Sequence, residues 1–193
     1  MSASDSHDGK SSSRTLARKD WCEAGLEALT ADGEKGLTIS RLAERLGVTY
    51  GSFYHHFGNS EEFHAAVLKH WFQELLVPLA RRNLAASRPS MEAVVRDVES
   101  SGYSPVEIAV RRWARDYAPA ATAVRRADRY RMRVMGQMLQ KRGVPPAEAR
   151  AKGELMLLSY LGALQHAKLK NREAAMKELV KMIDEIATGF EGE

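Results

Sequence analysis

The chain has very little cysteine: Cys22 is the only one in 193 residues. One cysteine excludes an internal disulfide framework and is typical of a reducing compartment. Long apolar runs are also missing, since none approaches the roughly eighteen residues of a membrane span, and the N-terminus lacks the apolar core of a secretory signal. We therefore expect a cytoplasmic protein without a membrane partner, in which Cys22 is a small buried hydrophobe.

Catalytic and metal-binding constellations are absent from the sequence as well. No nucleophile with an adjacent base, no metal-ligand spacing and no phosphate-binding glycine loop is present. His55 and His56 are adjacent, but neighbouring positions on a helix point in different directions, and no further ligands accompany them. The sequence predicts no catalytic residue, no metal and no cofactor, and a helical enzyme is the weaker alternative.

The net charge of +4 does not by itself indicate nucleic-acid binding. Residues 1–70 contain eight Lys and Arg against ten Asp and Glu, and the remaining twenty-one basic and fifteen acidic residues follow them. The basic excess therefore lies in the C-terminal part. Locally, however, residues 45–58 contain Arg45, His55 and His56 and no acidic residue. Any affinity for DNA would rest on few ion pairs and would depend only modestly on salt.

Strand and hairpin signals are also lacking. The apolar periodicity is helical throughout, and after Pro78 it is interrupted only at residues 87–90, 101–105, 142–146 and near Asn171. We predict an all-α chain of about nine helices.

Residues 38–63, TISRLAERLGVTYGSFYHHFGNSEEF, have the pattern of two short helices joined by a glycine turn. Thr38 is a good N-cap, and the apolar residues after it fall on one helical face. Gly47 stands where a helix favours a left-handed C-terminal residue, and Thr49 is placed to cap the next helix. The pattern is that of a helix-turn-helix.

The second of these helices has an apolar and a polar side. Phe53 and Phe57 are expected in the core, because they face the first helix. The other side carries hydroxyl groups and a glycine, which allow close approach to base edges and phosphates, and the helix N-terminus favours phosphate. Its members are Tyr50, Gly51, Ser52 and Tyr54. We expect this helix to enter the major groove.

The run GVTYGSFYHHF with its flanking helices resembles the TetR family of transcriptional regulators, over roughly residues 14–75. The resemblance implies that the first polar residues of the second helix face the operator and that Tyr54 and His55 bind phosphates. Ser60 stands where the family often has a lysine, although Asn59 and Glu62 still suit a helix start. The predicted DNA-binding residues are Thr38, Arg45, Thr49, Tyr50, Gly51, Ser52, Tyr54, His55 and Ser60.

The resemblance also implies a domain organisation. We expect a disordered tail at residues 1–13, a three-helix DNA-binding domain at residues 14–60, and a helical ligand-binding and dimerisation bundle at residues 61–193.

The last two predicted helices have more apolar surface than one bundle needs, and the resemblance implies that they pair with their copies in a homodimer. A buried central helix in a monomer explains the same pattern. The predicted interface residues are Leu155, Leu158, Gly162, Met176, Leu179, Ile183 and Ile186.

The bundle offers many unselective candidates for a small-molecule pocket. Those predicted to contact an effector are Trp113, Tyr117, Met132, Met135, Tyr160 and His166, although most would be ordinary core. If Arg112 or Arg115 beside Trp113 turns inward, an anionic ligand is favoured.

These features together predict a dimeric repressor that binds a palindromic double-stranded DNA operator and is released by a small molecule that moves the helix carrying residues 64–71. Two alternatives stay open: a ligand-dependent activator, and a protein-interaction adaptor that has lost DNA binding.

Overall fold

The structure is a computed structural model, and it describes residues 16–87, 89–165, 174, 177, 178 and 180–182. The predicted tail and several predicted site residues lie outside the described residues; these are His166, Met176, Leu179, Ile183 and Ile186.

The fold is all-α, as predicted: the described residues contain nine α-helices, a 3₁₀ turn and a π-helical segment, and no strand. The elements are α1 (Arg18–Asp32), η1 (Gly33–Leu37), α2 (Ile39–Leu46), α3 (Tyr50–Tyr54), α4 (Ser60–His70), η2 (Trp71–Leu76), α5 (Val77–Ala85), α6 (Met91–Ser100), α7 (Tyr103–Trp113), α8 (Ala118–Lys141) and α9 (Pro146–Gln165). No helix in the described part of the chain is both long and apolar enough to cross a bilayer.

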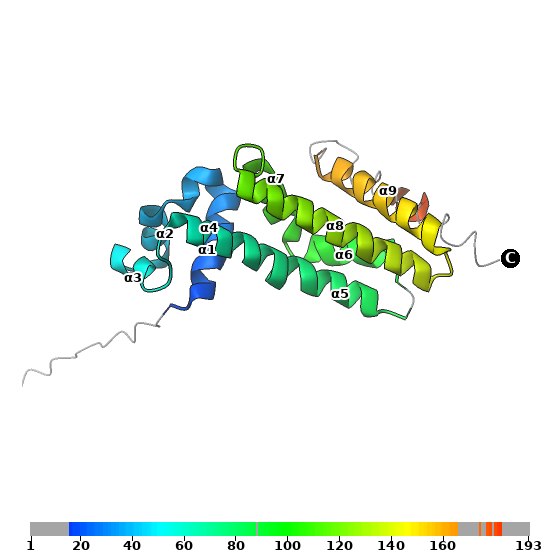
Figure 1. Ribbon diagram of the computed structural model, residues 1–193, viewed down its shortest axis with the longest axis horizontal. Coiled ribbons are helices and arrows are strands. Elements are labelled where there is room, and N and C mark those ends of the chain that lie inside the picture. Colours follow the sequence, from blue (N-terminus) through cyan, green and yellow to red (C-terminus); the bar gives the residue numbers. More distant parts are fainter. Residues whose placement is uncertain (1–15, 88, 166–173, 175–176, 179, 183–193) are drawn as a thin grey trace, which may run out of the picture.

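The molecule is elongated, with α1 to α4 gathered at one end and α5 to α9 forming a longer bundle (Figure 1). Helix α3 lies at the outer tip of the smaller end, far from α9. One continuous helical rod joins the two parts, because α4, η2 and α5 follow one another without a break, η2 being the π-helical stretch. Helix α1 also contacts α7, so the small end is packed onto the bundle.

An aromatic cluster holds the small end together. The ring of Phe53 lies 5.4 Å from that of Trp21, 5.2 Å from that of Phe57 and 5.5 Å from that of Phe63, measured between centroids. All four rings are at most 1% exposed. The expected core position of Phe53 and Phe57 is confirmed, and α3 is anchored by one side although it is only five residues long.

Helices α1 and α4 cross very closely at Gly25. A Cβ atom built there would lie 2.9 Å from both Phe63 Cζ and Val67 Cγ2, well inside van der Waals contact. The glycine therefore sets the depth at which α4 lies against α1. Since α4 is also the start of the rod, this contact fixes the rod to the helix-turn-helix.

Candidate functional site

The turn between α2 and α3 follows the local signals of the sequence. Gly47 has φ 66° and ψ 32°, the left-handed conformation that glycine adopts without strain. The Val48 N–H donates to Ala43 O at 3.0 Å, which closes the end of α2. Thr38 and Thr49 are the N-cap residues of α2 and α3, as predicted, but neither side chain accepts a capping hydrogen bond. Both threonines are exposed to solvent.

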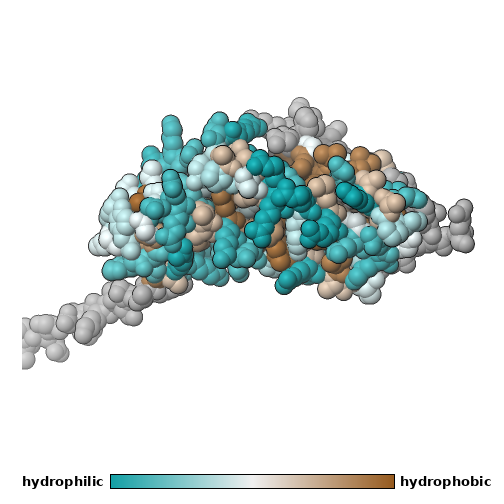
Figure 2. Space-filling view, viewed as in Figure 1, coloured by the Kyte–Doolittle hydropathy of each residue, from teal (hydrophilic) through white to brown (hydrophobic). Residues whose placement is uncertain are grey.

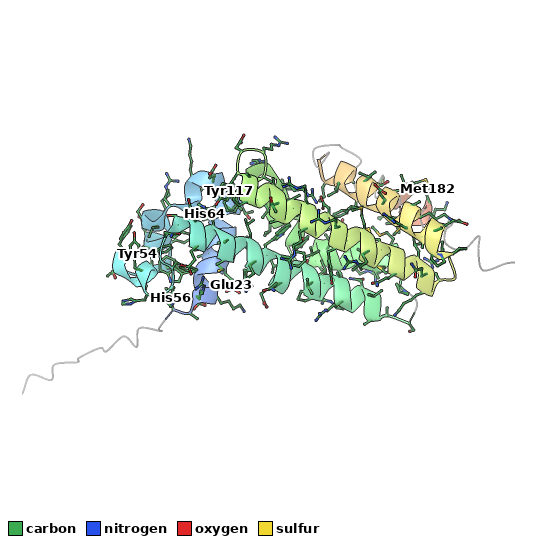
Figure 3. The ribbon with its side chains drawn as sticks, in the orientation of Figure 1. Glu23, Tyr54, His56, His64, Tyr117 and Met182 are labelled. Carbon is green, nitrogen blue, oxygen red and sulfur yellow. The ribbon has the colours of Figure 1, made fainter. Side chains whose placement is uncertain are left out.

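The exposed side of α3 is dominated by two tyrosines. Tyr50 is 52% exposed and Tyr54 is 51% exposed, which is unusual for such large rings. Their ring centroids are 5.6 Å apart and their hydroxyl oxygens 3.4 Å apart, so the two phenols form one platform. Tyr54 lies at the far tip of the molecule (Figure 3). The Tyr54 hydroxyl donates to the Tyr50 hydroxyl, and this hydrogen bond is the largest of the effects that raise the pKa of Tyr54, so its phenol stays protonated.

Gly51 lies between these tyrosines in sequence, and the fold does not require it. Its φ is not positive, and an added Cβ would meet only Thr49 Oγ1, at 3.9 Å. Glycine within a helix costs about 0.5–1 kcal/mol relative to alanine. Nothing in the described packing requires a glycine, so the position leaves open space on the exposed side of α3.

Arg18 fixes the loop that follows α3. Its guanidinium donates to His56 O at 3.1 Å and to Glu62 Oε1 at 2.7 Å, and lies 4.5 Å from the centroid of the Phe57 ring. Glu62 in turn accepts from the Gly58 N–H at 2.8 Å. The Gly58 hydrogen bond, followed by that from Arg18, lowers the pKa of Glu62. The sequence analysis missed Arg18, which positions α3 relative to α4.

The remaining predicted DNA contacts are less uniform. His55 is exposed, Ser52 is half-buried, and Arg45 is drawn toward Asp32 at 3.4 Å. Ser60 is the first residue of α4, where the Asn59 side chain accepts from the Glu62 N–H at 2.8 Å as expected. Glu61 and Glu62 follow Ser60 in the first turn, so this helix start is acidic. An anion is less favoured there than at α3.

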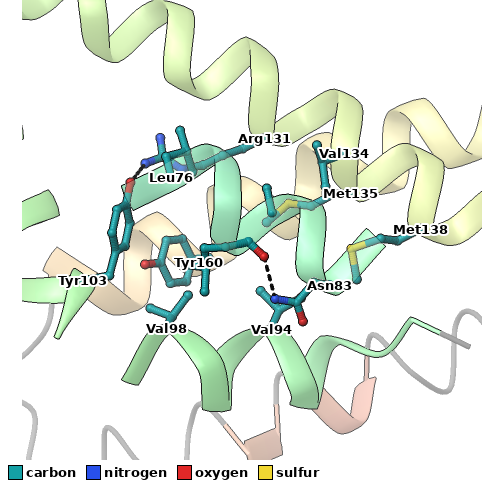
Figure 4. A pocket seen from close by; sticks show the side chains of 12 residues that line it. Leu76, Asn83, Val94, Val98, Tyr103, Arg131, Val134, Met135, Met138 and Tyr160 are labelled. Carbon is teal, nitrogen blue, oxygen red and sulfur yellow. Dashed lines mark hydrogen bonds between the residues drawn. The ribbon is translucent and has the colours of Figure 1, made fainter. Parts of the chain in front are cut away.

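The bundle encloses an apolar cavity of about 60 Å³ between α5, α6, α7, α8 and α9 (Figure 4). Of the predicted ligand residues, Met135 and Tyr160 line it, whereas Met132 lines a separate groove between α8 and α9. Trp113 and Tyr117 line neither. Their rings stack on each other at 4.8 Å between centroids, and both meet the edge of His64 on α4. They are therefore part of the junction between α4 and the bundle, where Figure 3 shows His64 and Tyr117.

A buried group of charges adjoins the cavity, and the sequence analysis missed it. Glu107, which is 0% exposed, accepts from Arg111 Nε at 2.6 Å and from Arg131 at 2.5 Å. Arg131 also donates to Asp128 at 2.9 Å and to the Tyr103 hydroxyl at 2.5 Å. Burial alone would lower the pKa of Arg131, but the surrounding acidic groups reverse the effect and raise it.

The two arginines that the sequence analysis singled out beside Trp113 do not turn inward. Arg112 and Arg115 are both exposed, and the inward positions belong to Arg111 and Arg131. The condition for an anionic ligand near Trp113 is therefore not met.

The outer face of α9 is apolar and exposed in the part of the chain that the structure describes. Leu155 is 55% exposed and Leu158 is 61% exposed, and a Cβ atom at Gly162 would meet nothing within 4 Å. Hydrophobic side chains gather over α9 in Figure 2, whereas hydrophilic ones cover the middle of the molecule along α8. Leu157 and Leu164, by contrast, are 2% and 3% exposed and face the bundle.

A short helix fixed by an aromatic core on one side and presenting hydroxyl groups on the other, after a tight left-handed turn, defines a helix-turn-helix protein. Residues 22–67 match the family model of bacterial regulatory proteins of the tetR family. The resemblance to the TetR family noted in the sequence is confirmed over this domain, residues 22–67.

Solved structures share the fold along nearly the whole chain. A transcriptional regulator from Rhodococcus sp. Rha1 is similar with a TM-score of 0.63 and 23% identity, covering 90% of this chain and 97% of that one. The regulatory protein TetR from Rhodobacter sphaeroides is similar with a TM-score of 0.67 and 18% identity, covering 87% of this chain and 97% of that one. The reduced form of E. coli NemR is similar with a TM-score of 0.67 and 17% identity, covering 88% of this chain and 96% of that one. A comparison with curated protein sequences found no match.

Proposed function

We propose that the protein is a cytoplasmic, non-enzymatic, dimeric repressor, which binds a near-palindromic operator and is released by a small-molecule effector. One observation carries the DNA-binding part: Tyr50, Gly51 and Tyr54 are presented to solvent on a helix whose opposite side is fixed by Phe53. A rigid, exposed helix with a side-chain-free position suits the major groove, where close approach and hydrogen bonding read base edges.

Within this proposal the predicted contacts divide by chemistry. Thr49, Tyr50, Gly51 and Ser52 form the first turn of α3 and approach the bases. Tyr54 and His55 follow at its end and bind phosphates, as the protonated Tyr54 phenol permits. Thr38, Arg45 and Ser60 flank them and contact the DNA backbone. The exposed Arg45–Asp32 ion pair, at 3.4 Å, is weak enough for Arg45 to leave Asp32 and bind a phosphate.

The dimer proposal rests on the outer face of α9. Leu155 and Leu158 leave more than half of their surface in water. Full burial of a leucine side chain is worth about 1.5–3 kcal/mol, so burying the exposed half of these two leucines in each of two subunits would recover roughly twice that amount. A second copy also sets two recognition helices at a fixed spacing, which a palindromic operator requires.

The proposed division of labour places the DNA contacts in residues 14–60 and the effector and dimer contacts in residues 61–193. The rod of α4, η2 and α5 belongs to both parts. Its α4 end packs on α1 through Phe63 and Val67, while Leu76 and Leu79 line the cavity. An effector in the cavity therefore touches the same rod that positions the helix-turn-helix.

The first experiment is a mobility shift with DNA from just upstream of the protein's own gene and excess competitor DNA. A specific shift supports the regulator. If the upstream DNA shows no specific shift, a selection for bound genomic fragments follows. Failure of both removes the DNA-binding proposal. The variant Tyr54→Phe loses only an exposed hydroxyl, so it should fold and dimerise normally while binding the operator several-fold more weakly.

The adaptor without DNA binding is favoured by one observation, the acidic start of α4 at Glu61 and Glu62 beside Ser60. It predicts that Tyr54→Phe changes nothing in the mobility shift, because no operator is bound. An activator instead predicts that the effector strengthens the shift.

A further inference from the structure

The cavity wall is apolar except for a polar edge on one side and the amide of Asn83 on the other. Leu79, Val98, Val134, Met135 and Met138 are among the residues that form the apolar part. Tyr103, Arg131 and Tyr160 supply the polar edge, and Figure 4 shows the Tyr160 ring in the midst of these side chains with its hydroxyl toward Tyr103. The Asn83 amide nitrogen already donates to Leu79 O and to Asp97 Oδ2, both at 3.0 Å. A ligand in this cavity is therefore mostly in contact with carbon atoms and meets the tyrosine hydroxyls at one end.

The charges at this edge already compensate one another. Arg111 and Arg131 are held by two carboxylates, those of Glu107 and Asp128, through the hydrogen bonds described above. Because two positive charges face two negative ones, no charge is left over for a ligand. An ion entering the cavity would lose its hydration without gaining a counter-charge, which is strongly unfavourable.

Tyr160 is the polar group that lacks a partner. Its side chain is 5% exposed, and its hydroxyl forms no hydrogen bond of ordinary geometry with any residue that the structure describes. Burial, followed by the charge of Glu107, raises the pKa of Tyr160 to about 12, so the phenol carries its proton at neutral pH. The buried Ser104 hydroxyl lies nearby on the donor side and acts to lower the pKa of Tyr160, so it is the proton of the Tyr160 hydroxyl that has no acceptor among the described residues. A buried hydroxyl without a partner is unfavourable, and a ligand oxygen would relieve it.

We propose that the effector of this regulator is a compact, uncharged, largely apolar molecule with one hydroxyl or carbonyl oxygen, which bonds to Tyr160. The inference rests on the proposed function and names the class of its ligand. A dry apolar cavity of about 150 Å³ accommodates benzene, whereas this one offers about 60 Å³. A six-membered ring therefore fits only if the wall yields, and Met135 and Met138 are the adaptable side chains there.

Four probes built on one fluorinated ring test the class directly: 4-fluorophenol and its isostere 4-fluorotoluene, and the two larger ions 4-fluorobenzoate and 4-fluorobenzylammonium. Binding of each to the full-length protein is followed by fluorine NMR at pH 7 without DNA. We expect the phenol to bind about tenfold more tightly than the toluene, which corresponds to about 1.4 kcal/mol, and the two ions not to bind. Tyr160→Phe should abolish the preference for the phenol while retaining the toluene. Tyr130→Phe, which removes the hydroxyl of a tyrosine on α8 that does not line the cavity, is the matched control.

Each other outcome overturns the inference. Equal binding of phenol and toluene, preference for either ion, an unchanged preference in Tyr160→Phe, or no binding of any probe contradicts it. The mobility shift on the same preparations separates the two proposals. A protein that binds operator but no probe remains a regulator with another effector, whereas one that binds the phenol but no operator retains the site and loses the proposed function. Thermal unfolding verifies that Tyr160→Phe is folded.

Discussion

Gly51 provides the sharpest test of the DNA-binding face, because stability and binding should change in opposite directions. Gly51→Ala adds one methyl group at a position where the protein offers open space, the nearest atom being Thr49 Oγ1 at 3.9 Å. Alanine is a better helix former than glycine by up to about 0.5–1 kcal/mol. For a protein of this length that gain corresponds to a rise in melting temperature of roughly 1–4 °C.

Operator binding by the same variant should weaken. The added methyl group points into the surface that, in our proposal, lies against the base edges, and overpacking a close interface costs about 1–3 kcal/mol. Since each subunit of a dimer presents one copy, we expect the affinity to fall by a factor of about ten or more. Fluorescence anisotropy with a labelled operator fragment measures the binding, and thermal unfolding followed by circular dichroism measures the stability.

The matched control is Gln137→Ala, which places an alanine at an exposed position of α8, away from α3. It should leave operator affinity unchanged. Wild-type affinity in a stabilised Gly51→Ala variant would refute the reasoning, because the missing side chain would then have no explanation in close approach. A destabilised variant would refute the claim that the fold leaves the position open.

Three further predictions follow from the buried and exposed groups of the bundle. Glu107→Gln leaves Arg131 buried beside a neutral partner, so the free energy of unfolding in urea should fall by about 3–5 kcal/mol; a loss below about 1 kcal/mol would contradict the buried network. Burial lowers the pKa of His64 from 6.5 against the opposing effect of nearby carboxylates, so the unfolded chain binds more protons, and the stability present above pH 6.5 declines as the pH falls through that range. His64→Phe should therefore show a smaller difference in urea stability between about pH 7.5 and about pH 5.5 than the wild type, and an unchanged difference would rule out this histidine. Leu158→Glu puts a charge on the exposed apolar face of α9, and sedimentation should show folded monomers, whereas a persistent dimer would place the interface elsewhere.

Short-range signals in the sequence predicted the helix-turn-helix well. The left-handed Gly47, the cap positions of Thr38 and Thr49 and the buried Phe53 each depend on a few neighbouring residues, so one stretch of sequence contains the whole pattern. What it could not contain is the part played by Arg18. The contacts of Arg18 with His56 and Glu62 span 38 and 44 positions, and no local periodicity relates residues so far apart.

The effector region was predicted less well, for a different physical reason. Arginine is abundant between residues 111 and 133, and composition does not say which of them point inward. A signal was nevertheless available: Arg131 falls on the same helical stripe as Ala127, Val134 and Met138, all of which are buried. An arginine in that register has to find carboxylates inside the bundle, and α7 supplies Glu107.

The π-helical segment η2, from Trp71 to Leu76, gives the connecting rod one adjustable stretch. A π turn closes with one residue more than an α turn, and each residue of an α-helix advances its axis rotation by about 100°. Absorbing or releasing that extra residue twists α4 about its own axis relative to α5 and leaves the rod unbroken. Leu76, the last residue of η2, also lines the cavity. In the proposed regulator, the cavity thus adjoins the point where the rod departs from α-helical geometry, and torsion there is the motion by which this geometry would carry an effector's presence to the operator-binding end.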